Sequence, residues 1–75
     1  MKEKLCEVVG RRVRSLREAQ GFSQESFAAR CNLHRTYIGG IERGERNITL
    51  ETLQTIAHAL NVSPVDLLKD SEPDV

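Results

Sequence analysis

Several patterns are missing from this 75-residue chain, and each absence removes a class of protein. No apolar run approaches the roughly 20 residues that a membrane-spanning helix needs. The charged N-terminus, Lys2-Glu3-Lys4, does not resemble a signal peptide. Neither a strand-like alternation of apolar and polar residues nor an internal repeat is present. We therefore expect a cytoplasmic, all-α protein with no membrane partner.

Metal-binding and catalytic patterns are also missing. Cys6 and Cys31 lie far apart and neither belongs to a Cys-x-x-Cys pair, while His34 and His58 do not complete a zinc site. The cysteines are most simply small, partly buried thiols of a cytosolic protein. Nothing pairs these groups or the carboxylates at a catalytic spacing. We expect no metal, no cofactor and no enzymatic activity.

The chain has no net charge, which at first argues against a nucleic-acid partner. The charges are nevertheless segregated along the sequence. Residues 1–47 hold ten Lys and Arg against six Asp and Glu, whereas residues 48–75 hold one Lys against five acidic residues. The N-terminal half is therefore basic and the C-terminal half acidic, so neutrality hides a strongly polar molecule.

Apolar periodicity predicts a single domain of five helices over residues 1–75, with a core at about 3–69 and an acidic tail at 70–75. The first helix, 3–20, carries the stripe Leu5, Val9, Val13, Leu16 and Ala19. A helix over 50–60, capped by Thr49 and closed by Asn61, carries Leu50, Leu53, Ile56, Ala57 and Leu60. Ser63-Pro64 begins the last helix, at about 64–69.

The segment 21–47 between these helices has the pattern of a helix-turn-helix. Ser23 is a preferred N-cap for its first helix, and Asn32 tolerates the turn conformation. Its second helix runs from about His34 to Arg43, and Gly44 stands just past its end. Two short helices joined by so short a turn commonly place the second one in the major groove of DNA.

The second helix of this unit divides into two faces at about 100° per residue. Ile38 and Ile41, with His34 between them, are predicted to face the core. The outward face holds Arg35, Thr36, Gly39 and Arg43. A merely solvated charged face remains the alternative, but the position of this face in the motif favours DNA contact.

The run SQESFA…LHRTYIGGIERGERNITLETLQTIAHALNVSPVDLL resembles the lambda-repressor and Cro type of helix-turn-helix family, also called the xenobiotic-response-element family. Its RTYIxGIER followed by RN is similar to the small controller proteins of bacterial restriction-modification systems. The resemblance covers about residues 8–69. It implies a five-helix lambda-repressor-like domain. It also implies a sequence-specific transcriptional regulator that binds a near-palindromic double-stranded operator as a homodimer.

The resemblance also implies roles for particular residues. Bases would be read by Arg35, Thr36 and Tyr37, where a half-buried structural ring is the alternative for Tyr37. DNA phosphates would be bound by Ser23, Gln24, Arg43, Arg46 and Asn47. Arg17 and Glu42 would form a structural ion pair. Gly39 departs from the pattern, because many family members carry a longer side chain there. Either close approach to DNA or an imperfect helix would explain the two adjacent glycines, Gly39 and Gly40.

Surplus apolar residues near the C-terminus suggest the dimer contact, and we expect it at Val62, Val65, Leu67 and Leu68. The acidic C-terminal half could contact RNA polymerase. Another reading stays open, in which the chain is an antitoxin or adaptor whose main partner is a protein. A ligand-sensing regulator is disfavoured, because one small domain leaves little room for a pocket, so no small-molecule ligand is expected.

Overall fold

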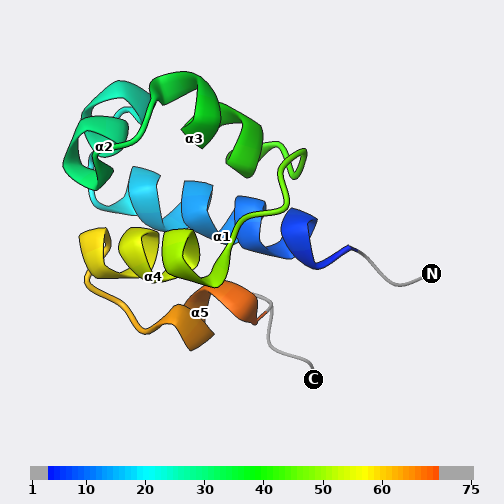
Figure 1. Ribbon diagram of the computed structural model, residues 1–75. Helices are drawn as coiled ribbons and strands as arrows, with labels where there is room; N and C mark the ends of the chain where they lie inside the picture. Colours follow the sequence, from blue (N-terminus) through cyan, green and yellow to red (C-terminus); the bar gives the residue numbers. More distant parts are fainter. Residues whose placement is uncertain (1–3, 70–75) are drawn as a thin grey trace.

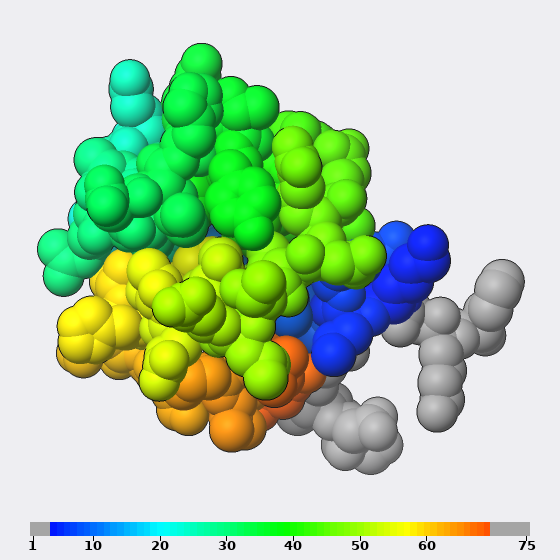
Figure 2. Space-filling view, viewed as in Figure 1, coloured from blue at the N-terminus to red at the C-terminus, as the bar shows by residue number. Residues whose placement is uncertain are grey.

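The computed structural model describes residues 4–69, and in this range the chain forms five α-helices and no strand. The helices are α1 (Leu5–Ala19), α2 (Gln24–Cys31), α3 (Arg35–Glu42), α4 (Leu50–Ala59) and α5 (Pro64–Leu68). Helices α2 and α3 lie together at one end of the molecule, at the top of Figures 1 and 2, and α4 and α5 lie at the other. The five-helix prediction is confirmed, while the predicted acidic tail falls outside the described residues.

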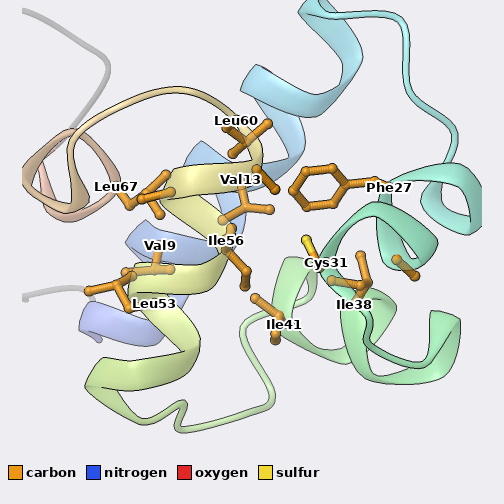
Figure 3. Close-up of a cluster of buried hydrophobic side chains, with 13 residues drawn as sticks. Val9, Val13, Phe27, Cys31, Ile38, Ile41, Leu53, Ile56, Leu60 and Leu67 are labelled. Carbon is orange, nitrogen blue, oxygen red and sulfur yellow. The ribbon is translucent and has the colours of Figure 1, made fainter.

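Helix α1 lies between the two ends and packs against both α3 and α5. The core that it helps to form draws apolar side chains from all five helices, as Figure 3 shows. Its largest fully buried side chains are Val13, Phe27, Ile38, Ile41, Ile56, Leu60 and Leu67. Ile38 and Ile41 therefore anchor the inner face of α3, as its apolar spacing predicts.

The predicted helix boundaries have visible causes. Ser23 Oγ accepts a hydrogen bond from the Ser26 amide at 3.0 Å, and Thr49 Oγ1 accepts one from the Thr52 amide at 3.0 Å. These bonds satisfy amides that the first turns of α2 and α4 leave without intrahelical partners. Asn32 and Asn61 end α2 and α4 in the left-handed conformation, at φ 58° and 59°. Asparagine tolerates this region better than most residues.

Close packing at Gly10 fixes the position of α3 against α1. A β-carbon at Gly10 would collide with the backbone carbonyl oxygen of Ile41, near the end of α3. The two helix backbones touch there, so any side chain at position 10 would push α3 outward. The absence of a side chain in α1 thus contributes to where α3 sits.

Four burial predictions are wrong. Leu5, predicted in the apolar stripe of the first helix, is 59% exposed because it is the first residue of α1 and lies beyond the core that begins at Val9. Leu50 is 83% exposed, because it is the first residue of α4 and lies beyond the edge of the core that begins at Leu53. His34 is exposed because it is the N-cap of α3, with extended backbone at ψ 143°, and so does not follow the helical spacing. Ala19, in the last turn of α1, is also exposed.

Candidate nucleic-acid interface

A buried polar network joins the first three helices. Arg17 Nε donates to Glu42 Oε2 at 2.6 Å and Arg17 Nη2 donates to Glu42 Oε1 at 3.0 Å, so the pair from α1 and α3 is bidentate. Gln24 Nε2, at the start of α2, donates to the same Glu42 Oε1 at 3.0 Å. Arg17 also donates to the Phe22 carbonyl oxygen at 2.7 Å. This network fixes α2 and α3 relative to each other.

Arg17 remains charged at every accessible pH in this setting. Its hydrogen bonds to Glu42 raise the pKa of the guanidinium above its usual value, although burial opposes the shift. Arg17 therefore supplies a constant positive charge to the pair. Paired ions with all their hydrogen bonds made are the form in which charge is tolerated inside a protein.

The N-terminal part of α3 presents polar side chains to solvent. Arg35 and Thr36 are exposed, and the Tyr37 ring is partly buried against the core. The N-cap His34 accepts a hydrogen bond at Nδ1 from the Thr36 amide at 3.1 Å. The residues expected to read bases thus lie on one exposed helix end whose backbone is capped. Tyr37 has both a packed and an open side.

The two adjacent glycines of α3, Gly39 and Gly40, are covered by other side chains rather than open to solvent. Gly39 and Gly40 are both buried. A β-carbon at Gly39 would lie 3.2 Å from Arg43 Nη1 and 3.7 Å from Gln24 Oε1. A β-carbon at Gly40 would lie 3.1 Å from Arg46 Cγ. Side chains of this chain cover both glycines, an arrangement that the sequence does not predict.

The turn after α3 returns the chain toward the helix that it has just left. Gly44 adopts φ 75°, a conformation that glycine reaches without a β-carbon penalty. The Gly44 amide donates to the Ile41 carbonyl and the Glu45 amide to the Gly40 carbonyl, each at 3.0 Å. These two hydrogen bonds together form a Schellman motif. Figure 2 shows the 43–49 segment beside α3 on one continuous surface.

The residues expected to bind phosphate fall into two groups. Arg43, Arg46 and Asn47 are exposed after the end of α3, with Arg43 Nε 3.1 Å from Glu45 Oε2 and the Arg46 guanidinium 5.7 Å from the Tyr37 ring centroid. Ser23 and Gln24 stand at the start of α2. Ser23 is exposed but its hydroxyl caps α2, and Gln24 is already bonded to Glu42.

The predicted dimer residues do not all reach the surface. Leu67 is fully buried in the core of its own chain, so it is unavailable to a partner, and this assignment is corrected. Val62 is partly buried against the same core. Val65 and Leu68 are 62% and 39% exposed. Two large exposed apolar residues were missed, namely Leu5 and Leu50.

The exposed apolar residues border two depressions, formed by the start of α1, the loop before α4, and helices α4 and α5. An apolar hollow there is lined by Leu5, Val9, Leu50, Leu53 and Leu68 together with the loop before α4. A shallow groove beside it is lined by Leu50, Pro64, Val65 and Leu68. The exposed residues Leu5, Leu50, Val65 and Leu68 are called the apolar face below. Apolar periodicity placed Leu5 and Leu50 in the buried stripes, but each is the first residue of its helix and lies outside the core.

The remaining predicted features are placed as follows. Cys31 is buried, and desolvation raises the pKa of its thiol to about 11. Cys6 is partly buried, and its thiol donates to the Gly44 carbonyl oxygen at 3.2 Å. Among residues 4–69, no cluster of three or more His, Cys, Asp or Glu could hold a metal ion. Within the same span, no helix has the length and apolarity to cross a membrane.

Comparison with known proteins agrees with this geometry. The family model described as Helix-turn-helix matches residues 13–67. The control protein C.BamHI of Bacillus amyloliquefaciens is 50% identical over 60 residues, which cover 79% of this chain and 74% of that protein. The control protein C.SmaI of Serratia marcescens is 52% identical over 62 residues, which cover 83% and 74% of the two chains.

Solved structures give the same result. The restriction-modification controller protein C.AhdI of Aeromonas hydrophila superposes with a TM-score of 0.79 at 44% identity, covering 83% of this chain and 94% of that one. The controller C.Esp1396I, in a structure bound to a 25-base-pair operator site, gives a TM-score of 0.77 at 39% identity, covering 88% and 87%. The chain therefore belongs to the helix-turn-helix family, and its relatives there include controller proteins of restriction-modification systems.

Proposed function

We propose that this protein is a sequence-specific, double-stranded-DNA-binding transcriptional regulator, and that it acts as a restriction-modification controller. It binds a near-palindromic operator as a homodimer, with α3 in the major groove. The observation that carries the proposal is the exposed polar and basic face of α3, held in place by the Arg17–Glu42–Gln24 network. The operator-bound structure of C.Esp1396I supports it. The proposed activity is DNA binding without a catalytic step. A regulator of this kind acts in the cytoplasm, and we propose that location for this protein.

Base reading is assigned to the start of α3. Arg35 is exposed and its planar fork matches the O6 and N7 acceptors of guanine, which makes it the first candidate. Thr36 is exposed beside it and can contact a thymine methyl group or a phosphate. Tyr37 contributes the open side of its ring and its hydroxyl. Three reading residues on one helix end are few, so the shape of the DNA contributes to specificity.

Phosphate binding is assigned to both sides of the groove. Arg43, Arg46 and Asn47 follow α3 and are exposed, so their side chains can reach one strand. At the start of α2, Ser23 and Gln24 offer helix N-terminal amides to the other strand, where the helix dipole favours an anion. These contacts fix the register of the protein on the duplex rather than its sequence preference.

The homodimer interface is assigned to the apolar face, which lies at the α4–α5 end of the molecule. Leu5, Leu50, Val65 and Leu68 are the exposed large apolar residues among those described, and their burial by a second copy removes them from water. A symmetric pair would present two α3 helices about 34 Å apart, one helical turn of DNA. Contact with RNA polymerase through the acidic C-terminal half remains part of the proposal, as does the single-domain organisation of residues 1–75.

The test is selection of bound sequences from random DNA, followed by titration of the selected duplex. Arg35→Ala should lose roughly 1–3 kcal/mol of binding free energy and relax the preference at one base pair per half-site. Arg14→Ala is the matched control, because Arg14 is an exposed arginine of α1 paired with Glu18. If Arg35→Ala kept the wild-type ratio of operator to random-DNA affinity, Arg35 would not be a reader.

A salt titration of the same complex separates a regulator from an adaptor. Phosphate contacts release counterions, so the affinity of a DNA-binding regulator falls steeply with salt concentration. Binding that is absent, or that does not depend on salt, would favour the antitoxin or adaptor alternative.

A further inference from the structure

We propose that Gly40 is a positioning residue for Arg46: its bare backbone seats the Arg46 side chain on α3, and the Tyr37 ring holds the guanidinium ready for DNA. This inference rests on the proposed function, since it concerns how one DNA contact is prepared before DNA arrives. It explains the glycine at position 40 by packing within the chain rather than by close approach of DNA.

The first step is the backbone turn. Gly44 at φ 75° lets the Glu45 amide donate to the Gly40 carbonyl oxygen at 3.0 Å. The chain is thus tied back to α3 one residue before Arg46. Because this bond is to the backbone of Gly40 itself, Arg46 starts its side chain close to that residue.

The second step is the contact between the Arg46 stem and Gly40. A β-carbon at position 40 would lie 3.1 Å from Arg46 Cγ, 3.2 Å from Nε and 3.7 Å from Cδ. The distances to Cγ and Nε are shorter than most β-carbons have to a neighbouring side chain. A β-carbon at position 40 would therefore force the Arg46 stem to shift by a few tenths of an ångström, and a larger side chain would force a larger shift. Gly40 is buried while Arg46 itself stays exposed.

The third step is the stack of the guanidinium on Tyr37. Tyr37 lies three residues before Gly40, so the two share one side of α3. The Arg46 Cζ atom lies 5.7 Å from the ring centroid, within the range of a cation–π contact. The aliphatic part of the Arg46 side chain therefore lies against Gly40, and its guanidinium lies against Tyr37, along one side of α3. Tyr37 and Arg46 form one preassembled unit.

Preassembly affects affinity because a free arginine loses rotamer freedom when it binds. Holding one long side chain in its bound position is worth roughly two- to tenfold in affinity. Gly40→Ala should forfeit part of this gain, and Gly40→Val more of it. Only side-chain atoms of Arg46 stand in the way, so the helix itself can accept alanine, which favours helix over glycine.

Gly39 provides the matched control. It lies next to Gly40 in α3, but a β-carbon there would meet Arg43 Nη1 at 3.2 Å and Gln24, not Arg46. Gly39→Ala should therefore leave the Arg46–Tyr37 contact unchanged. The two alanine variants differ by one position and displace different arginines.

The positioning can be measured without DNA. Tyr37 is the only tyrosine and the sequence has no tryptophan, so tyrosine emission reports on this ring alone. Ring-current shifts of the Arg46 side-chain protons should be present in the wild type, Tyr37→Phe and Gly39→Ala. They should shrink in Gly40→Ala and vanish in Tyr37→Leu. Unchanged shifts in Gly40→Ala and Gly40→Val would overturn the proposal.

The functional consequence is tested by a double-mutant cycle on the selected operator. Arg46→Ala should weaken binding, and Gly40→Ala should cause no further loss in that background, whereas the loss caused by Gly39→Ala should persist. If the double variant lost as much operator affinity as the product of the two single losses, this inference would be overturned, while the proposed function would stand. A wild-type protein that bound no duplex would overturn the proposed function as well.

Discussion

The α2–α3 end and the α4–α5 end of this molecule use opposite chemistry. At the α2–α3 end, polar side chains are paired before any partner arrives: Arg17 with Glu42, Gln24 with Glu42, and Arg46 with Tyr37. At the α4–α5 end, Leu50 and Val65 are left uncovered. Polar recognition needs fixed geometry because hydrogen bonds are directional, whereas an apolar contact needs only matching surfaces.

The largest expected effect comes from breaking the polar network. The Glu42 side chain is 3% exposed, and Glu42→Ala would leave Arg17 charged and buried without its partner. Removing one member of such a pair should lower the free energy of unfolding by about 3–5 kcal/mol. Denaturant titration followed by circular dichroism measures the change.

Glu18→Ala is the control for this experiment. Glu18 also approaches Arg17, with 3.7 Å between Nη2 and Oε2, but its side chain is 54% exposed. An exposed pair should contribute at most about 1 kcal/mol. Equal losses for the two variants would show that burial of the Arg17–Glu42 pair does not distinguish it.

Substitutions in the apolar face at the α4–α5 end should change the stability of the monomer little and its dimerisation clearly. Leu50→Glu and Val65→Glu replace exposed residues, so the free energy of unfolding of the monomer should change by no more than about 0.5 kcal/mol. If the apolar face is the dimer contact, each should raise the dimer dissociation constant about tenfold. Sedimentation equilibrium against Ala19→Glu, an exposed site of α1, checks this. Wild-type dissociation constants in both variants would assign the dimer to another surface.

The smallest effect concerns pH at the start of α5. The Ser63 amide donates to Asp66 Oδ2, and this bond, followed by the contact with Lys69, holds the pKa of Asp66 below its usual value. A carboxyl with a lowered folded pKa stabilises the fold above its unfolded pKa of about 3.9, and this contribution is lost as pH falls through the folded value. The stability difference between wild type and Asp66→Asn should therefore shrink below about pH 4. Parallel stability curves would contradict this.

The sequence was sufficient for the features that depend on local chemistry. Ser23, Thr49 and Ser63 cap helices as predicted, and Asn32 and Asn61 adopt the turn conformation. These residues act on backbone groups within three positions along the chain. Their roles are therefore visible without knowledge of the fold.

The features that the sequence did not predict depend on distant segments. Whether Leu50 is covered depends on where the core ends, and helical spacing does not contain that information. Close approach of DNA or an imperfect helix was the expected explanation for Gly39 and Gly40, but Gln24, Arg43 and Arg46 lie against them. Only the return of the chain at Gly44 brings Arg46 there. Leu67 was assigned to a partner because its burial by other helices cannot be read from α5 alone.

Helix α1 packs against α3 through Gly10 and against α5, where Arg12 Nε donates to the Asp66 carbonyl oxygen at 2.9 Å. It therefore sets the distance between the proposed reading helix and the proposed dimer face. Under the proposed function, the spacing between operator half-sites is fixed by how α1 packs. A substitution at Gly10, remote from every base, would then change which spacing the dimer prefers.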